Sequence, residues 1–258
     1  MVISVSVAPV YKEAGFTSEM TTNGLMFESV IILGKQDSWL KVKMEDGYEG
    51  WMHHFYLSEY QVNPHNRLIL TDRYTPLRLQ RGKDGQIIAL LSFGTVVPLI
   101  KKTSGYCKIQ MINGEEAFIP AQQEILQQNR SDIIRLITNL LGVPYLWGGK
   151  SSFGYDCSGL VQMVLKAAGI SINRDSNEQS KDEKLEDISM NDTEVGDLVF
   201  FSENECINHV AFFAGEGKII HCSGEVKIES IIKGELGFNN KLAKLKHTFK
   251  SLSKVVYS

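Results

Sequence analysis

The sequence lacks any long hydrophobic run. No stretch approaches the roughly 18 apolar residues of a transmembrane helix, so neither a membrane span nor a membrane partner is expected. The first ten residues, MVISVSVAPV, have no Lys or Arg before their apolar part and alternate apolar with polar residues, which is typical of a strand and not of a secretory signal. We therefore expect a cytoplasmic protein, or a periplasmic or extracellular one if a signal peptide has been removed.

An excess of positive charge is also missing. The chain has 27 Lys and Arg against 30 Asp and Glu, which gives a formal net charge of −3. Nucleic acid is therefore not an expected partner, because such proteins usually carry a basic surplus. Small molecules or neutral polymers remain open as substrates, and a monomer is expected.

Cysteines are few. Cys107, Cys157, Cys206 and Cys222 form no CxxC pair, and four cysteines in 258 residues do not make a disulfide framework. Reduced thiols are expected, with room for one reactive group among them. Cys107 and Cys222 lie in strand patterns that suit a small buried side chain, whereas Cys206 lies in a polar stretch and is expected to be exposed.

The first half of the chain contains an internal repeat at an offset of 67 residues. Matched turns, aromatic residues and alternating apolar positions at one period indicate duplication of a structural unit. The Asp-Gly and Asn-Gly pairs lie between short alternating runs and predict β-hairpins. The aligned segments are Ala8–Val10 with Thr75–Leu77, Trp39–Val42 with Tyr106–Ile109, Asp46-Gly47 with Asn113-Gly114, and Trp51-Met52 with Phe118-Ile119.

Two small all-β barrels account for this repeat, since each unit has about 60 residues and several short strands. The W-x-K-V and DGY-x-GW pattern of the first unit resembles bacterial SH3 domains. In the second unit Ala117-Phe118 stands where the first has Gly50-Trp51, so a binding surface is not expected there.

The pattern changes near Asn129. Apolar residues recur at helical spacing from Ile133 to Leu141, with Asn129 or Ser131 as cap, and a second helix is expected from about Cys157 to Ala168. Helices followed by short consecutive strands favour an α+β domain with an antiparallel sheet. The expected strands are 197–201, 209–213 and 218–222, and a linker is expected near 121–129.

Cys157 is the candidate nucleophile. A helix N-terminus offers free N–H groups and a partial positive charge, which favour a thiolate and can stabilise an oxyanion. His209 is expected at the start of one strand and His221 at the end of the next, across the Gly215–Gly217 turn. His209 could then act as the base, and His221 could orient it.

Other interpretations of these residues remain open from spacing alone. A cysteine at a helix start is often a small buried residue, and a histidine in a strand is often structural. A zinc site of Cys157, His209, His221 and Cys222 is disfavoured, because adjacent strand residues point to opposite faces and the spacing does not suit tetrahedral ligation. No metal and no cofactor are expected.

Residues 130–222 resemble the NlpC/P60 family of cysteine peptidases. The motifs that carry the resemblance are Tyr145-x-Trp-Gly-Gly, Asp156-Cys-Ser-Gly-Leu, Arg174-x-Ser-x-x-Gln179, Gly196-Asp-Leu-Val-Phe-Phe and His209-Val-Ala-Phe-Phe followed by Ile219-Ile-His221. The resemblance implies a papain-like fold that cleaves cell-wall peptides. It also implies Cys157 as nucleophile, His209 as base and His221 as third member, with Tyr145 near the thiol.

The predicted fold class is therefore α+β, with a papain-like NlpC/P60 catalytic domain at 126–258 preceded by two SH3-like barrels at 1–60 and 61–125. This arrangement resembles the γ-D-glutamyl-L-diamino acid endopeptidases. The resemblance implies cleavage between γ-D-Glu and diaminopimelate or Lys in peptides with a free N-terminal L-Ala, as in recycling of murein peptides.

The resemblance further implies which residues bind the substrate amine. Asp156 and Ser158 are expected beside it, and an acidic residue and a tyrosine of the first module are expected to contact the alanine. Glu19 and Tyr48 are the candidates, with Glu13 and Glu49 as rivals. The alternative functions are an exported autolysin whose modules bind intact wall, a binding protein with an inactive peptidase domain, and a lipid acyltransferase.

Overall fold

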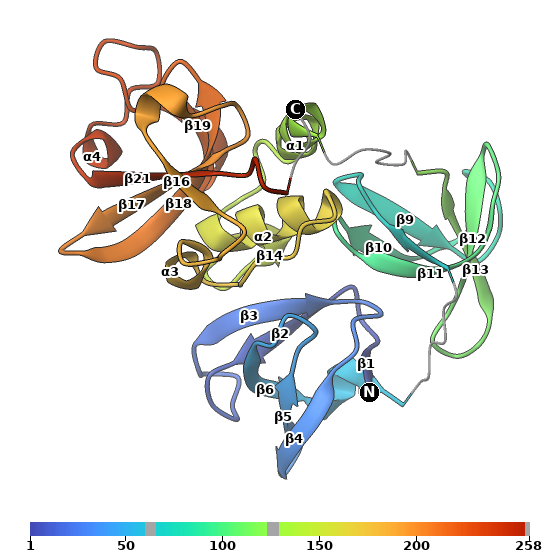
Figure 1. Cartoon of the computed structure of the whole chain (residues 1–258). Helices are drawn as coiled ribbons and strands as arrows, with labels where there is room; N and C mark the ends of the chain where they lie inside the picture. Colours follow the sequence, from blue (N-terminus) through green and yellow to red (C-terminus); the bar gives the residue numbers. More distant parts are fainter. Residues whose placement is uncertain (60–65, 123–128, 256–258) are drawn as a thin grey trace. The chain divides into compact units, whose positions relative to one another are not determined.

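The computed structural model describes residues 1–59, 66–122 and 129–255, and Figure 1 shows the course of the chain. The predicted α+β class is confirmed, because short helices accompany a chain that is mostly strands. The predicted domain boundaries at 60/61 and 125/126 fall outside the described residues and stay predictions. Most of the predicted linker at 121–129 also falls outside them.

Contacts between residues divide the chain into two units that do not follow the sequence order. A short segment of the predicted catalytic domain belongs to the unit of the N-terminal repeat. The first unit comprises Met1–Glu124 and Trp147–Ser152, and the second comprises Ile125–Leu146 and Phe153–Ser258.

The first half of the repeat forms a five-stranded sheet with the strand order β3-β2-β6-β5-β4. The Asp46-Gly47 turn joins β5 to β6, and Gly47 has a left-handed φ of 86°, which explains why glycine stands there. The elements are β1 (Val2–Ile3), β2 (Val7–Tyr11), β3 (Met20–Leu25), β4 (Ile31–Gln36), β5 (Trp39–Lys43), β6 (Glu49–His53), the 3-10 helix His54–Tyr56 and β7 (Leu57–Ser58).

The second half repeats this plan in a six-stranded sheet with the order β10-β9-β13-β12-β11-β8. An offset of 67 residues carries β2, β3, β5 and β6 onto β9, β10, β12 and β13, residue for residue. The repeat seen in the sequence is therefore a repeat of strands. The elements are β8 (Arg67–Ile69), β9 (Tyr74–Arg78), β10 (Ile87–Ser92), β11 (Val96–Lys102), β12 (Tyr106–Gln110) and β13 (Glu116–Pro120).

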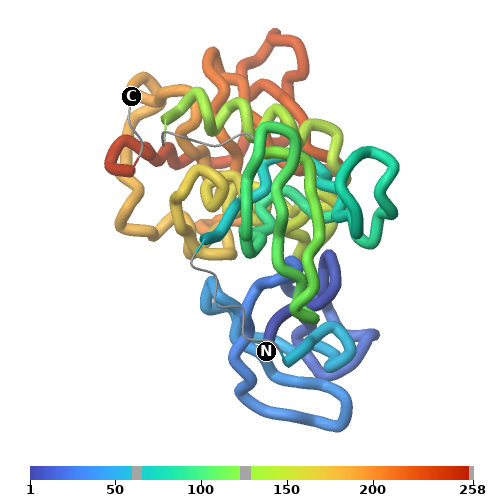
Figure 2. The backbone as a smooth tube through the Cα atoms, turned by 90° about the vertical axis from the view of Figure 1, so that its right-hand side faces the viewer, coloured from blue at the N-terminus to red at the C-terminus, as the bar shows by residue number. Residues whose placement is uncertain are grey.

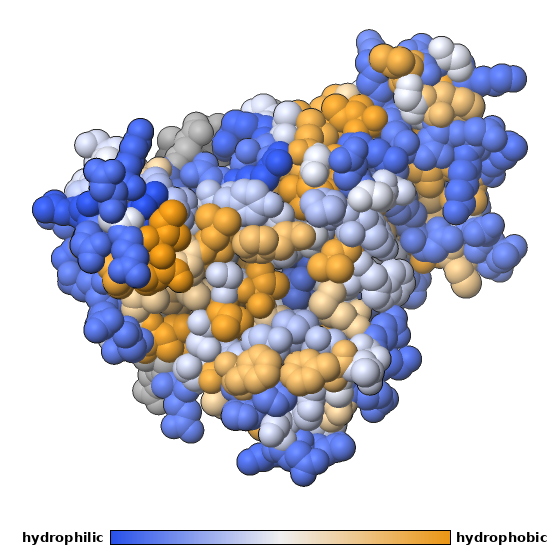
Figure 3. Space-filling model, turned by 180° about the vertical axis from the view of Figure 1, so that it is seen from behind, coloured by the Kyte–Doolittle hydropathy of each residue, from blue (hydrophilic) through white to orange (hydrophobic). Residues whose placement is uncertain are grey.

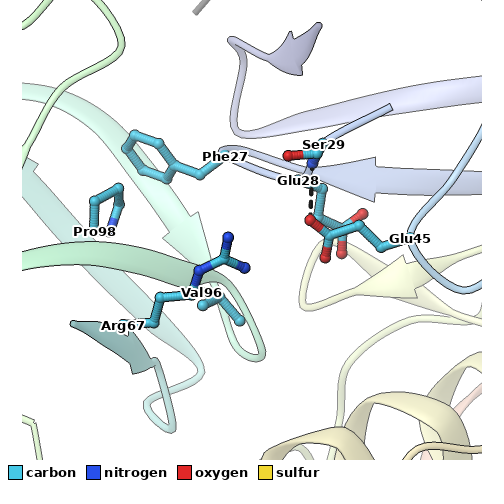
Figure 4. A pocket seen from close by; sticks show the side chains of 7 residues that line it. All are labelled: Phe27, Glu28, Ser29, Glu45, Arg67, Val96 and Pro98. Carbon is cyan, nitrogen blue, oxygen red and sulfur yellow. Dashed lines mark hydrogen bonds between the residues drawn. The ribbon is translucent and has the colours of Figure 1, made fainter. Parts of the chain in front are cut away.

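The two halves share apolar packing. Met26 and Phe27 of the first half belong to the buried cluster of the second half, together with Leu70 and Leu91. A small pocket lies beside Phe27 and is lined by residues of both halves (Figure 4). In it, the backbone N–H of Ser29 donates to Glu45 Oε1 at 3.0 Å. Because Phe27 is inserted in this way, the two halves pack against each other within one unit.

The second unit combines helices with a sheet of order β16-β21-β17-β18-β19-β20, in which all pairs are antiparallel. Figure 2 traces the same strands from orange to red along the chain. The elements are α1 (Arg130–Thr138), β15 (Gly154–Tyr155), α2 (Cys157–Ala167), α3 (Ser176–Gln179), β16 (Glu186–Ile188), the 3-10 helix Met190–Asp192, β17 (Leu198–Glu203), β18 (Cys206–Gly215), β19 (Lys218–Ser223), β20 (Glu225–Ser230), α4 (Asn240–Ala243) and β21 (Lys246–Ser251).

The predicted helices of the second unit are present with small differences. The side chain of Asn129 caps α1, as expected, by accepting from the backbone of Asp132 at 2.8 Å, but α1 ends at Thr138, before the expected Leu141. α2 packs on β18 and β19 through a fully buried apolar side. The helix that begins at Cys157 is thereby held against the strands that carry both histidines.

Two predictions about strand ends are wrong. His209 does not begin a strand, because β18 already starts at Cys206. The strand expected at 197–201 also continues to Glu203, because it enters a tight hairpin in which Asn204 and Glu205 take left-handed φ angles of 51° and 65°. Polar residues favour a loop in sequence patterns, but here they pair as the ends of two neighbouring strands, Ser202 with Ile207 and Glu203 with Cys206. Cys206 is exposed and Cys107 and Cys222 are buried, as predicted.

Exposed apolar side chains are scattered over the surface, as Figure 3 shows for one face. The most continuous group in the first unit is Ile31, Ile32 and Leu33 on the edge strand β4, with exposures of 64%, 38% and 46%. In the part of the chain that the structure describes, no helix is long and apolar enough to cross a membrane.

Candidate active site

Cys157 is the first residue of α2, and Asp156 caps the helix. The carboxylate of Asp156 accepts from the backbone N–H of Gly159 at 2.6 Å, which ends the preceding extended chain and starts the helix. Backbone N–H groups of Ser158 and of Val210 in β18 donate to the Cys157 sulfur. The nucleophile candidate therefore lies where the helix start meets the strand of His209.

The expected lowering of the thiol pKa at this helix start is wrong. Burial, with a smaller contribution from the Asp156 carboxylate, raises the pKa of Cys157 to about 11. The two backbone donors and Arg174 oppose this effect but do not outweigh it. Cys157 is thus a thiol at neutral pH, and a base must remove its proton when it reacts.

The two histidines lie together on the sheet. Phe212 pairs with Ile220, so His209 and His221 are diagonal neighbours on one face of the β18–β19 hairpin. His209 Nε2 lies 2.7 Å from His221 Nδ1, and the rings meet edge to face. His221 is fully buried. The proximity expected from the Gly215–Gly217 turn is confirmed.

A carboxylate completes this row of polar groups. His221 Nε2 lies 2.9 Å from Glu229 Oε2 on β20, and Asn239 donates to the same oxygen at 2.6 Å. Sequence reasoning missed Glu229 and Asn239. Gly224 could have indicated them in the sequence, because it predicts a turn. A hairpin at this turn, where Gly224 has a φ of 76°, places Glu229 diagonally beside His221.

Burial keeps the two histidines neutral. It lowers the pKa of His209 to about 3, with the neighbouring His221 acting in the same direction. It also lowers the pKa of His221, against the opposing charge of Glu229. Partial burial acts to raise the pKa of Glu229, but hydrogen bonds from Asn239, Lys227 and His221 together lower it below its usual value. At neutral pH the site therefore holds a thiol, two neutral imidazoles and a carboxylate.

Asp156 and Ser158 lie in a buried network around Arg174. Arg174 Nη1 donates to Asp156 Oδ1 and to Ser158 Oγ, both at 2.9 Å, and its Nη2 donates to Asp156 Oδ2. Gln179 donates to the backbone oxygens of Ser158, Asn173 and Arg174, so it fixes this loop. The structure adds Arg174 as the cation that balances Asp156, a role that sequence reasoning did not assign.

Tyr145 lies near the thiol, as expected. Burial and the nearby Cys157 and Asp156 raise the pKa of Tyr145 to about 12. The ring is still 37% exposed. Its hydroxyl therefore stays protonated and can donate a hydrogen bond at the edge of the site.

Glu19 and Tyr48 lie in the first unit. Glu19 is half-exposed and accepts from the indole N–H of Trp147 at 3.0 Å, with Lys12 Nζ at 3.9 Å. Tyr48 is partly buried and packs on the core of the first sheet. Trp147 follows Tyr145 by two positions in the chain. The Tyr145-x-Trp-Gly-Gly motif is therefore divided, with Tyr145 in the second unit and Trp147 in the first.

The segment that follows Tyr145 and Leu146 is embedded in the first unit. Lys150, 3% exposed, lies with its Nζ 3.2 Å from Asp46 Oδ2 and 3.6 Å from Glu28 Oε2. The backbone N–H of Ser152 donates to Ser92 Oγ at 2.8 Å. We call Trp147–Ser152 the anchored segment, because its side chains and backbone are held by both halves of the repeat.

A metal site finds no support among the residues described. Within the ranges 1–59, 66–122 and 129–255, no group of three or more His, Cys, Asp or Glu side chains is arranged to hold a metal ion. Cys222, which the disfavoured zinc site would require, instead donates its S–H to the carbonyl of Tyr155 at 3.1 Å.

Two family models match this chain, one in the peptidase-like part and one in the first half of the repeat. Residues 142–239 match the NlpC/P60 family, and residues 6–58 match the bacterial SH3 domain. The first match contains the cysteine, both histidines, Glu229 and Asn239. The second match covers the first half of the repeat.

Two known proteins that are similar to most of this chain carry the same name. The chain is 33% identical over 245 residues to the gamma-D-glutamyl-L-lysine dipeptidyl-peptidase of Bacillus subtilis (strain 168), covering 88% of this chain and 81% of that protein. It is 28% identical to the protein of the same name from Bacillus cereus (strain ATCC 10987 / NRS 248), covering 79% and 67%.

A solved structure shares the whole fold. The crystal structure of an NlpC/P60 family protein from Bacillus cereus ATCC 10987 superimposes with a TM-score of 0.81 at 22% identity. The match covers 96% of this chain and 97% of that one. The similarity therefore extends through the N-terminal repeat as well as the catalytic part.

Proposed function

Since this chain belongs to the NlpC/P60 family of cysteine peptidases, we propose that it hydrolyses the bond between γ-D-Glu and a diamino acid in short cell-wall peptides. The observation that carries the proposal is the row of two hydrogen-bonded histidines beside a cysteine at a helix start. The names of the two Bacillus relatives support the γ-D-glutamyl substrate and favour lysine or a similar diamino acid after it.

The first half of the reaction acylates the enzyme. His209 accepts the proton of the Cys157 thiol while the sulfur attacks the γ-carbonyl carbon of D-Glu. In this proposal the backbone N–H groups near the sulfur and the hydroxyl of Tyr145 stabilise the negative oxygen of the tetrahedral intermediate. The His209 imidazolium then gives its proton to the departing amine of the diamino acid, which leaves a thioester on Cys157.

The second half releases the product. His209, neutral again, accepts a proton from water, whose oxygen attacks the thioester carbon. The S–C bond breaks and the thiolate recovers its proton from His209, so the dipeptide leaves as a free acid. His221 Nδ1, 2.7 Å from His209 Nε2, steadies the ring of His209 throughout.

We propose that the N-terminal amine of the substrate is bound by the four residues that were predicted to contact the terminal alanine. A free ammonium at a closed site needs a carboxylate partner. Asp156 is already paired with Arg174, so we propose Glu19 as the main charge partner, with Tyr48, Ser158 and Asp156 supplying further polar contacts. Selection for a free N-terminal L-Ala would suit the recycling of released murein peptides inside the cell, by a monomeric enzyme.

The experiment that tests this function is a paired digestion. L-Ala-γ-D-Glu-diaminopimelate, its lysine analogue and the N-acetylated form of each are incubated with the enzyme, and the released dipeptide is quantified. We expect cleavage of the free-amine peptides and at least about tenfold slower cleavage of the acetylated ones, because acetylation removes the charge. Equal cleavage would refute amine recognition, and no cleavage of any peptide would refute the proposed function.

Replacing Glu19 by glutamine should mainly raise KM. The carboxylate is half-exposed, so the loss of its pairing with an ammonium should raise KM about two- to fivefold while kcat stays within a factor of two. Steady-state kinetics on the free-amine peptide measures both constants. Glu13→Gln and Glu49→Gln, two exposed glutamates of the same module, are the matched controls. A control that raises KM as much as Glu19→Gln does would remove Glu19 from the site.

A further inference from the structure

Glu229 and Asn239 lie beyond the cysteine and the two histidines and are not used by the reaction steps above. The carboxylate of Glu229 is surrounded by donors. Lys227 Nζ lies 3.1 Å from Oε1, while His221 and Asn239 both contact Oε2. A carboxylate can only accept, so every group that contacts it must present a proton.

The orientation of the Asn239 amide is determined by the chain around it. Its Oδ1 accepts from the backbone N–H groups of Lys241 and Leu242, at 3.0 and 2.9 Å, as the cap of α4. Backbone N–H groups only donate, so the amide oxygen must face them and the amide NH₂ must face Glu229. The hydrogen bond of 2.6 Å from Asn239 to Glu229 Oε2 therefore has one possible direction.

The same argument shows which ring nitrogen carries the proton in each of the two histidines. His221 Nε2 must carry a proton toward the carboxylate, so in neutral His221 the Nδ1 atom is an acceptor. His209 Nε2, 2.7 Å from that acceptor, must then carry its own proton. This leaves His209 Nδ1 without a proton, which is the form that can accept one from a thiol.

We propose that Glu229 and Asn239 are positioning residues that fix the tautomers of both histidines, so that His209 Nδ1 is the base for Cys157. The α4 cap fixes Asn239, Asn239 and Lys227 fix the carboxylate, and the carboxylate fixes the two imidazoles in turn. The kinetic consequence depends on the proposed function, whereas the position of the protons does not.

The sharpest variant exchanges the two side chains, as Glu229→Gln with Asn239→Asp. Size and net charge are conserved, and aspartate caps a helix as well as asparagine does. In the exchanged pair the introduced aspartate accepts from the NH₂ of the introduced glutamine, and the glutamine oxygen accepts from Lys227. An N–H then faces His221 Nε2, which reverses both tautomers and puts a proton on His209 Nδ1.

Glu229→Gln alone is the matched control. Its amide oxygen can occupy the place of Oε2 and still accept from His221 and Asn239, because the half-exposed Lys227 can turn toward solvent. We expect kcat of this single variant to fall less than about tenfold, whereas the exchanged pair should fall at least about 10³-fold, as when a triad carboxylate is replaced by an amide. KM should stay within about threefold in both variants, since neither residue is proposed to bind substrate.

Protons are located without substrate by ¹⁵N NMR of labelled histidines in the Cys157→Ala background, where no thiol exchanges with His209. We expect the proton on His209 Nε2 in that background, and on Nδ1 when the exchanged pair is added. A proton on Nδ1 before the exchange, or an exchanged pair whose kcat lies within about tenfold of Glu229→Gln, would overturn the proposal. Thermal unfolding shows whether each variant folds, and an inactive parent enzyme would refute the proposed function while leaving the NMR result to decide this one.

Discussion

Replacing Cys157 by alanine should lower kcat for the free-amine peptide by at least about 10⁴-fold, because removal of a nucleophile leaves only binding and charge stabilisation. The thiol supplies the atom that bonds to the substrate carbon, and no neighbouring group can replace it. Alanine removes a single sulfur atom, and the Asp156 cap that starts α2 does not involve it. The fold should therefore persist, with little change in the unfolding midpoint.

Binding and chemistry can be separated with this variant. Calorimetry of Cys157→Ala with intact peptide should give a dissociation constant close to the KM of the active enzyme if binding precedes slow chemistry. Cys206→Ala is the matched control, since this exposed thiol lies in the β17–β18 hairpin and should leave kcat unchanged. A Cys157→Ala variant with more than one hundredth of the parent kcat would exclude a thioester mechanism.

Acid should destabilise the protein strongly through His209. Its pKa is about 3 when folded and 6.5 when unfolded, so below pH 6.5 the unfolded chain binds a proton that the folded one does not. Stability is thus fully present above pH 6.5 and falls by about 1.4 kcal/mol per pH unit until about pH 3, up to about 5 kcal/mol for this residue. A typical domain has only about 5–15 kcal/mol of stability, so the effect is large.

Denaturant unfolding at several pH values measures this slope. His221, whose pKa is also lowered by burial, loses stability in the same direction below pH 6.5. Glu229, with a lowered pKa, adds a loss as the pH falls from its unfolded value of 4.5. His209→Asn removes one titrating group and should reduce the slope between pH 6.5 and 4.5 by about 1.4 kcal/mol per unit. An unchanged slope in that variant would mean that His209 is not held neutral.

Local patterns in the sequence predicted much of the fold. The offset of 67 residues located matching strands, because hairpin turns such as Asp46-Gly47 and Asn113-Gly114 need residues that tolerate left-handed φ. The cap of α1 was also predicted, since Asn129 accepts from a backbone N–H group three residues later in the chain. These features depend on neighbours in the chain, which a sequence shows directly.

The missing parts of the site depend on contacts across the sheet. Glu229 lies among Glu225 and Lys227 on an outer strand, where alternating charges usually indicate only a solvated face. The thiol pKa was mispredicted for a related reason. The helix start favours a thiolate, but burial against β18 favours a thiol, and the extent of burial cannot be read from α2 alone.

The anchored segment has a consequence for recombination between proteins. Lys150 is encoded within the catalytic part, yet the carboxylates that balance its buried charge, Glu28 and Asp46, are encoded more than 100 positions earlier. A chimera that joins this peptidase to foreign N-terminal modules would bury a lysine without its counter-charges, which is costly. Selection should therefore transmit the repeat and the peptidase as one heritable block, and an engineered exchange should carry residues 147–152 with the repeat that holds them.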